Sequence, residues 1–225
     1  RNDSGIRLNS ALSEAFRELR TSLLLSRANH PAHSILVTSA RSGEGKTTVA
    51  MNLAASLAQL GRRTLLIDAD MRRPSIQNYF PQGKSQLGAY LAGKGNWQDI
   101  VIQTEVAGLD VLLSGRAPAN PAELLSSDAM RTLMQEAEPA YQFVVLDSPP
   151  LLNVADSRIL ASLADSTVLV VKCGETPRHV VQYAEMQARA AGANLVGVVL
   201  NYLDVRNTGY SYQVYRPSEE STLRS

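Results

Sequence analysis

The sequence is short of cysteine, of histidine and of net charge, and each shortage excludes something. Cys173 is the only cysteine among 225 residues, so no internal disulfide can form, which fits a reducing, cytosolic setting. The three histidines have no metal-ligand spacing. The formal net charge is +1, so the chain lacks the overall basic field that favours nucleic acid or an anionic membrane surface. We therefore expect no nucleic-acid partner.

Long apolar runs are missing as well. No stretch approaches the roughly 18 apolar residues that a membrane helix requires, and no secretory leader is recognisable. Hydrophobic residues make up 44% of the chain, which at this length is enough for one α/β domain with a substantial core. Because the sequence begins at Arg1 rather than at a methionine, we expect it to be part of a longer protein.

Apolar strands alternate with helical patterns along most of the chain. After a first helix that ends before His30-Pro31, we expect strands at residues 34–39, 64–67, 109–113, 143–146, 167–171 and 195–200, and helices at 47–60, 120–138, 156–163 and 177–191, with short helices within 71–106. Most of the strands are continuous apolar runs, which is typical of a mostly parallel sheet covered by helices on both faces. The sequence predicts a three-layer α/β fold with an N-terminal helix (1–30), a core (31–203) and a polar tail (204–225).

A glycine-rich loop with one lysine joins the first expected strand to the next helix. It reads Ala40-Arg41-Ser42-Gly43-Glu44-Gly45-Lys46-Thr47-Thr48. Backbone N–H groups at such a turn bind anions, and glycine lets the backbone wrap around a phosphate. Lys46 supplies charge to the β- and γ-phosphates, and the Thr47 hydroxyl is placed to bind Mg²⁺. The loop thus predicts a P-loop that binds a nucleoside triphosphate through residues 41–48; the alternative is a glycine turn with an incidental lysine.

Acidic residues follow two later strands. Asp147 ends one of them, where α/β folds bind their ligands, and a carboxylate there commonly holds Mg²⁺ through water. Asp68 and Asp70 are two residues apart, so on an extended chain they point the same way, and one can hold Mg²⁺ while the other faces a nucleophile. Arg72 adds a cation that offsets transferred charge or pairs with a carboxylate. The alternatives are a strand-end cap for Asp147 and a solvated acidic turn for the others.

Tyrosines cluster in the polar tail. Tyr210, Tyr212 and Tyr215 lie among glycine, serine, glutamine and arginine, where no core could bury all three. With a phosphoryl-transfer site on the same chain, phosphate acceptors are the favoured explanation. A docking peptide for another protein is the alternative.

These motifs resemble those of the bacterial tyrosine kinases of capsule and exopolysaccharide export, a P-loop family unrelated to eukaryotic protein kinases. The family allows Ala or Gly at the opening of the first motif, as at Ala40. Its other motifs are three apolar residues followed by Asp-x-Asp-x-Arg or by Asp-x-Pro-Pro, an early Glu-x-x-Arg-x-x-Arg and a tyrosine-rich C-terminus. Residues 65–72 match the Asp-x-Asp-x-Arg motif, and residues 144–150 match the Asp-x-Pro-Pro motif. Glu14, Arg17 and Arg20 match the early motif, and Tyr210, Tyr212 and Tyr215 match the tyrosine-rich C-terminus.

The resemblance implies ATP-dependent autophosphorylation of the tail tyrosines between subunits. It also implies roles for single residues: Asp68 as the base on the tyrosine hydroxyl, Lys46 as the charge on the transferring phosphate, and Asp70, Asp147 and Thr47 as the residues that organise Mg²⁺. Asn201, which closes the last expected strand, matches the position at which related ATPases contact adenine.

Partners and location are implied in the same way. A ring-like homo-oligomer would use Glu14, Arg17 and Arg20, which without the resemblance indicate only ion pairs on a solvated helix face. In the family the kinase is attached to membrane helices on the same chain, which the missing initial methionine favours, or activated by a separate membrane protein. The resemblance also implies two further partners, a cognate tyrosine phosphatase and the polysaccharide export machinery. The implied location is the cytoplasmic face of the bacterial inner membrane.

Two other functions are compatible with a P-loop. Partner-positioning ATPases of the partition and division-site type carry Lys-Gly-Gly-x-Gly-Lys-Thr. This chain has Arg41-Ser42-Gly43 in place of the opening Lys-Gly-Gly, and those ATPases lack a tyrosine tail. A nucleotide-bound scaffold without catalysis would not need intact Lys46 and three aspartates. Transfer of label from ATP to tyrosine separates the three possibilities.

Overall fold

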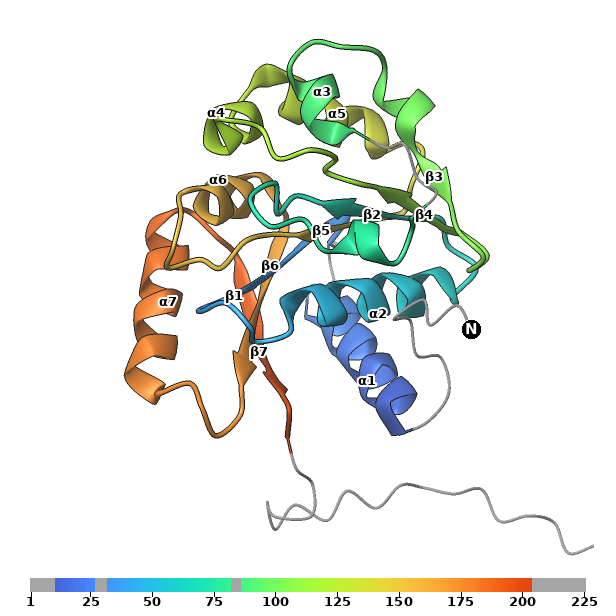
Figure 1. The fold of residues 1–225 in the computed structure, drawn as a ribbon. Helices are drawn as coiled ribbons and strands as arrows, with labels where there is room; N and C mark the ends of the chain where they lie inside the picture. Colours follow the sequence, from blue (N-terminus) through green and yellow to red (C-terminus); the bar gives the residue numbers. More distant parts are fainter. Residues whose placement is uncertain (1–10, 27–31, 82–85, 204–225) are drawn as a thin grey trace, which may run out of the picture.

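A seven-stranded sheet forms the middle layer of the computed structural model, which describes residues 11–26, 32–81 and 86–203 (Figure 1). The strand order is β3-β4-β2-β5-β1-β6-β7, and each neighbouring pair is parallel except β3 and β4. The strands are β1 (Ser34–Ser39), β2 (Thr64–Asp68), β3 (Ile102–Gln103), β4 (Leu109–Leu112), β5 (Phe143–Asp147), β6 (Ser166–Lys172) and β7 (Leu195–Asn201). The expected α/β class and the mostly parallel sheet are confirmed.

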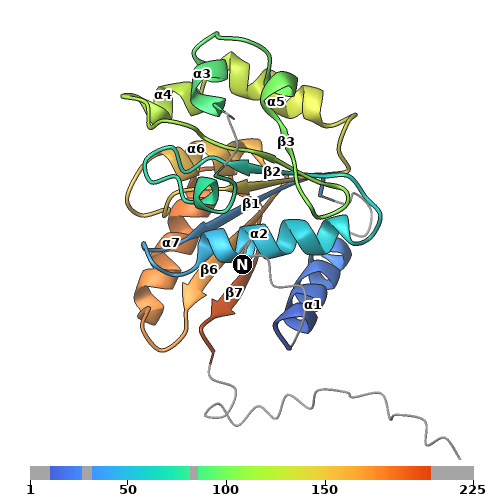
Figure 2. The same ribbon diagram turned by 45° about the vertical axis from the view of Figure 1, so that its right-hand side comes forward.

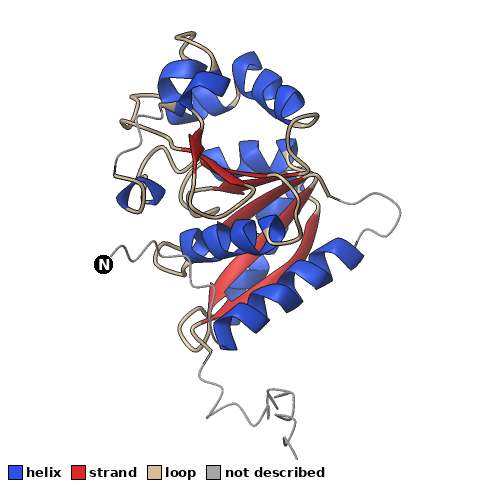
Figure 3. Cartoon of the chain, turned by 90° about the vertical axis from the view of Figure 1, so that its right-hand side faces the viewer, coloured by secondary structure: helices blue, strands red, loops and turns tan. Residues whose placement is uncertain are grey.

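Helices cover both faces of the sheet (Figures 2 and 3). They are α1 (Ala11–Leu25), α2 (Lys46–Ala58), α3 (Leu87–Leu91), α4 (Pro121–Leu125), α5 (Asp128–Ala137), α6 (Asp156–Leu163) and α7 (Arg178–Ala190), with 3-10 turns η1 (Ile76–Asn78) and η2 (Trp97–Ile100). In the described part of the chain, no helix combines the length and the apolar character that crossing a membrane requires.

Two hydrophobic cores lie on opposite faces of the sheet because side chains alternate along each strand. Ile35 and Val37 of β1 belong to the core beneath α1 and α2, whereas Leu36 between them belongs to the core beneath α3 to α7. Burial on both faces explains why the strands are continuous apolar runs. Trp97 is buried in the second core, and its indole N–H donates to Glu136 at 2.7 Å.

The expected elements agree with the structure to within two residues, with two exceptions. The single helix expected at 120–138 is wrong, because the chain breaks into α4 and α5. Ser127 has an extended backbone, and its hydroxyl accepts the N–H of Met130 at 3.4 Å, so it caps a new helix. The short strand β3 was not expected. Residues 1–10 and the tail from 204 lie outside the described part, and the proposed division of the chain stays a prediction.

Candidate active site

The strand order brings the three motifs together. Strands β2, β5 and β1 are neighbours, and all three are parallel, so their carboxyl ends meet at one edge of the sheet. In this register Asp68 of β2 is paired directly with Asp147 of β5, and Asp147 is paired with Val37 of β1. The phosphate loop follows β1 and leads into α2. Residues that are more than a hundred positions apart in sequence therefore surround one site.

The phosphate loop has a backbone that requires glycine. Gly43 and Gly45 have φ angles of 85° and 87°, in the left-handed region that other residues rarely adopt. A Cβ atom on Gly45 would lie 2.0 Å from the Asn201 amide nitrogen, so a side chain at this position would displace Asn201. Helix α2 begins at Lys46, and Gly45 supplies no side-chain cap for its first N–H groups. These groups are available to an anion, as the loop sequence predicted.

Lys46 is held by a carboxylate inside the site. Its Nζ lies 3.1 Å from Asp70 Oδ2, and the two side chains are 15% and 4% exposed. The other oxygen of Asp70 accepts the N–H of Arg73 at 3.1 Å, while the Thr47 hydroxyl accepts from Ser75 at 3.2 Å. The expected juxtaposition of Lys46, Thr47 and Asp70 is therefore present. A triphosphate would compete with Asp70 for the lysine.

Asp68 and Asp147 are both fully buried. Asp68 Oδ2 accepts the N–H of Ile76 at 3.2 Å, but Asp68 Oδ1 and both oxygens of Asp147 have no hydrogen-bond partner among the described residues. Leaving buried carboxylate oxygens unpaired is costly. Such oxygens fit a site that receives a cation or a proton during function.

The carboxylates are suited to Mg²⁺ rather than to a metal bound by protein alone. Within residues 11–26, 32–81 and 86–203, no group of three or more His, Cys, Asp or Glu side chains is arranged to hold a metal. Mg²⁺ typically takes one or two carboxylates and completes its shell with phosphate oxygens and water. The Thr47 hydroxyl, Asp70 and Asp147 are the residues that would provide that partial set.

Burial changes the acidity of these groups. It raises the pKa of Asp147 to about 7, with Asp70 acting in the same direction, while Lys46 lowers it. Thr47 lies near enough to lower it too, although the two side chains do not meet in hydrogen-bond geometry. Burial, followed by the negative charge of Asp147, raises the pKa of Asp68 well above its ordinary value. Both residues therefore hold protons more readily than free carboxyls.

We expect Asp147→Asn to stabilise the ligand-free protein at alkaline pH. The pKa of Asp147 is about 7 when folded against an ordinary 3.8, so the folded state binds the proton more tightly. Stability contributed by this group falls as pH rises from about 4 to about 7, and the penalty is complete above 7. Removing it should raise the free energy of unfolding by about 1–3 kcal/mol at pH 8, and by little at pH 4. Thermal melts at the two pH values measure this.

Asp156→Asn is the matched control for that measurement. Asp156 is equally buried, but it pairs with Arg72, so its replacement should lower the melting temperature at both pH values. A lower melting temperature for Asp147→Asn at pH 8 would mean that the Asp147 carboxylate stabilises the fold.

Arg72 pairs with a carboxylate, which is the second of the two roles expected for it. Its Nε and Nη2 donate to the two oxygens of Asp156, both at 2.9 Å. Asp156 lies in the first turn of α6, so this pair ties the segment after β2 to the helix after β5. The sequence analysis missed Asp156, and its only signal was an acidic residue at the start of an expected helix.

Asn201 contacts the phosphate loop itself. Its Nδ2 donates to the carbonyl of Glu44 at 3.0 Å, and its Oδ1 accepts the N–H of Tyr202. The adenine contact stays a prediction, but Asn201 does lie at the site. Tyr210, Tyr212 and Tyr215 belong to the segment that follows β7 in sequence and lie outside the described residues.

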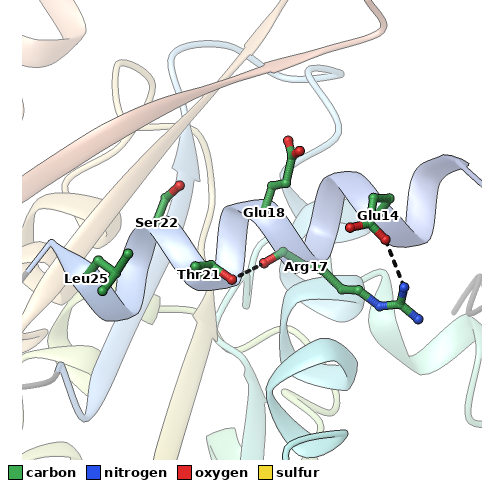
Figure 4. A pocket seen from close by; sticks show the side chains of 6 residues that line it. All are labelled: Glu14, Arg17, Glu18, Thr21, Ser22 and Leu25. Carbon is green, nitrogen blue, oxygen red and sulfur yellow. Dashed lines mark hydrogen bonds and ion pairs between the residues drawn. The ribbon is translucent and has the colours of Figure 1, made fainter. Parts of the chain in front are cut away.

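The three residues of the early motif separate in the structure. Glu14 and Arg17 form an exposed ion pair of 2.8 Å on α1 and line a shallow hollow with Glu18, Thr21, Ser22 and Leu25 (Figure 4). Arg20 instead donates to the carbonyl of Ser56 in α2 at 2.6 Å, within its own chain. Glu14 and Arg17 are available for a contact between subunits, whereas Arg20 holds α1 on α2.

Comparisons with known proteins agree with this geometry. Residues 32–182 match the AAA domain family. Tyrosine-protein kinase YwqD of Bacillus subtilis is 40% identical over 190 residues, which is 84% of this chain and 80% of YwqD. Putative tyrosine-protein kinase CapB of Staphylococcus aureus is 34% identical over 90% of both chains. Tyrosine-protein kinase etk of Escherichia coli K12 is 36% identical over 88% of this chain, but that match spans 28% of etk.

Solved structures show the same likeness. The chimerical protein CapA2B2 superposes with a TM-score of 0.84 at 35% identity, over 89% of this chain and 90% of that one. The kinase domain of Escherichia coli ETK gives 0.82 at 35% identity, over 88% and 79%. The septum site-determining protein MinD of Pyrococcus horikoshii, complexed with Mg-ADP, gives 0.63 at 22% identity over 75% and 69%, and shares the fold alone.

Proposed function

Because the chain belongs to the bacterial tyrosine kinases of capsule and exopolysaccharide systems, we propose that it phosphorylates the tyrosines of its own C-terminal tail, and does so between copies. It is an ATP-dependent protein-tyrosine kinase. One observation carries the assignment of its active site: the phosphate loop and the acidic ends of β2 and β5 meet at one sheet edge, where three buried carboxylate oxygens have no partner in the described structure. The partition-type ATPase is not favoured, since the relatives at 34–40% identity are named kinases.

The chain's residues divide the work of phosphoryl transfer. The loop N–H groups and Lys46 bind the β- and γ-phosphates, and Thr47, Asp70 and Asp147 would hold Mg²⁺. Bound Mg²⁺ would neutralise negative charge on the phosphates. Lys46, once it turns from Asp70 to the γ-phosphate, stabilises the charge of the transferring group.

Asp68 is the proposed base. Its raised pKa suits a group that takes the proton of a tyrosine hydroxyl while the tyrosine oxygen bonds to phosphorus and ADP departs. Asp68 is closed to solvent in this structure, and the N–H of Ile76 occupies Oδ2. The acceptor hydroxyl can therefore reach Asp68 only after the residues that cover this carboxylate move.

The tail is suited to reach a neighbouring copy. It continues from β7, and a polar chain extends by about 3.3 Å per residue, so the twelve residues 204–215 can span about 40 Å. Each phosphotyrosine adds about −1.5 to −2 charges. Phosphorylated tyrosines are repelled by Asp68, Asp70 and Asp147, so the unmodified tail docks and the modified tail leaves. Subunits held partly by tail docking and partly by Glu14 and Arg17 then separate more readily.

Mixing two complementary variants, one without catalysis and one without acceptor tyrosines, tests the transfer between copies. A Lys46→Met chain with an intact tail should be labelled from ATP by an active chain whose Tyr210, Tyr212 and Tyr215 are replaced by phenylalanine. The control is a Lys46→Met chain that also lacks the three tyrosines, which should stay unlabelled. Absence of label on the intact tail would refute transfer between copies.

Light scattering on the same proteins reports on assembly. The assembly formed by the unphosphorylated protein should be larger than that of the phosphorylated protein. Arg17→Ala should reduce the size of the assembly without lowering the melting temperature, because Arg17 is exposed. Arg20→Ala should lower the melting temperature as well, since it removes the bond to Ser56. A size that is indifferent to phosphorylation and to Arg17 would contradict the proposed assembly.

The setting of the kinase is part of the proposal. The match to etk spans 28% of that kinase, so etk is much longer than this chain. We propose that a membrane-spanning region, on the same chain or on a separate activator, holds the kinase at the cytoplasmic face of the bacterial inner membrane. There a cognate tyrosine phosphatase would reset it, and the polysaccharide export machinery would respond to it.

A further inference from the structure

A buried carboxylate lies inside the phosphate loop. Glu44 is 2% exposed, and it occupies a position at which the P-loop pattern accepts any residue. A negative charge in a loop that receives a triphosphate repels the ligand, and burial strengthens that repulsion. The Glu44 side chain must therefore contribute something that offsets this cost.

Its two oxygens bond in different directions. Oε2 accepts the N–H of Arg41 at 2.5 Å, which closes the loop on itself. Oε1 accepts the hydroxyl of Thr176, and it also accepts the N–H of Lys172 at 3.5 Å. The side chain thus connects the start of the phosphate loop to the turn between β6 and α7.

That turn is a fixed anchor. The carbonyl of Lys172 accepts the N–H groups of Glu175 and Thr176 at 3.3 and 3.1 Å, and the N–H of Cys173 donates to the carbonyl of Asn201 at 2.9 Å. The turn is therefore closed internally and joined to β7. The backbone carbonyl of Glu44 accepts from Asn201, so the loop is attached to the same anchor at a second point.

The loop needs such an anchor because of its glycines. Gly43 and Gly45 flank Glu44, and glycine can adopt many backbone conformations at little cost. Only a subset of these directs the loop N–H groups at a phosphate. Hydrogen bonds from the residue between the two glycines select one of them before the ligand arrives.

We propose that the Glu44 side chain is a positioning residue, which holds the phosphate loop in its triphosphate-binding shape by bonding Arg41 and Thr176. The inference rests on the proposed nucleotide site and adds a role that the nucleotide-binding pattern does not require. The gain from a preorganised loop exceeds the repulsion between the Glu44 carboxylate and the phosphates.

Charge and positioning make opposite predictions for Glu44→Ala. Loss of repulsion alone would tighten the binding of a non-hydrolysable ATP analogue with Mg²⁺, measured by calorimetry. Loss of positioning should weaken it about tenfold. In kinase assays we expect KM for ATP to rise by a similar factor and kcat to change less than about threefold, because the loop holds substrate and transition state alike. Glu44→Gln should restore most of the affinity, since an amide accepts from Arg41 and donates to the Thr176 oxygen.

Thr176→Val tests the anchor without altering the loop. It removes the hydroxyl at nearly constant shape and should also weaken nucleotide binding, by several-fold. Glu175→Ala is the matched control in the same turn; its side chain is exposed and pairs with Lys172 on the surface, so affinity should be unchanged. Melting curves show that each variant is folded, and Thr176→Val decides the matter if Glu44→Ala does not fold.

The outcomes separate two failures. Undiminished affinity in Glu44→Ala or in Thr176→Val overturns the positioning role. A wild-type protein that does not bind the analogue overturns the proposed function instead.

Discussion

Replacing Lys46 with methionine is expected to lower tyrosine phosphorylation at least about 100-fold while the protein stays folded. The loop sequence predicts that Lys46 lies at the phosphates. In the described structure its Nζ lies 3.1 Å from Asp70 in the acidic site. Removing a charge that stabilises a transferring group typically costs about 100-fold or more in rate. Incorporation of labelled phosphate into tyrosine measures the loss directly.

The Lys46→Met variant needs a stability control, because it removes the cation that pairs with the buried Asp70 carboxylate. We expect a lower melting temperature, so the assay belongs well below it. Lys94→Met makes the same chemical change at an exposed lysine after α3 and should keep wild-type activity. Near-wild-type labelling in a folded Lys46→Met protein would show that the phosphates bind elsewhere.

Replacing Asp68 with asparagine is expected to reduce the rate of phosphotransfer far more than the affinity for Mg²⁺-ATP. An amide cannot accept the tyrosine proton, and general-base catalysis contributes typically 100- to 10,000-fold. The raised pKa of Asp68 also implies that the wild-type rate increases with pH as this carboxyl loses its proton. Single-turnover rates and calorimetry on the same preparation separate chemistry from binding.

Asp70→Asn provides the contrasting signature. Asp70 pairs with Lys46 and is proposed to organise Mg²⁺, so its replacement should weaken nucleotide binding as well as the rate. If the Asp68→Asn affinity falls in step with its rate, Asp68 is a metal-site residue and the base lies elsewhere.

Much of this site was predictable because each motif is local. The glycines around Glu44 and the lysine after them identify a phosphate loop by spacing alone, and the apolar runs before Asp68 and Asp147 place these carboxylates at strand ends. Parallel strands present their carboxyl ends at one edge, so the meeting of the motifs followed from fold class. The helix break was missed because Ser127, which caps a new helix, interrupts an otherwise continuous helical pattern.

The sequence by itself determined the fold class, the nucleotide-binding loop and the acidic strand ends, since these depend on periodicity and on spacing between near neighbours. Only the tertiary structure decided which charged side chains have partners far away in the sequence. Arg72 bonds Asp156, 84 residues away, Arg20 bonds Ser56, and Glu44 bonds Thr176, 132 residues away. The physical reason is that strand order and register set these distances. No local pattern records which buried carboxylate will face a cation, a hydroxyl or no partner at all.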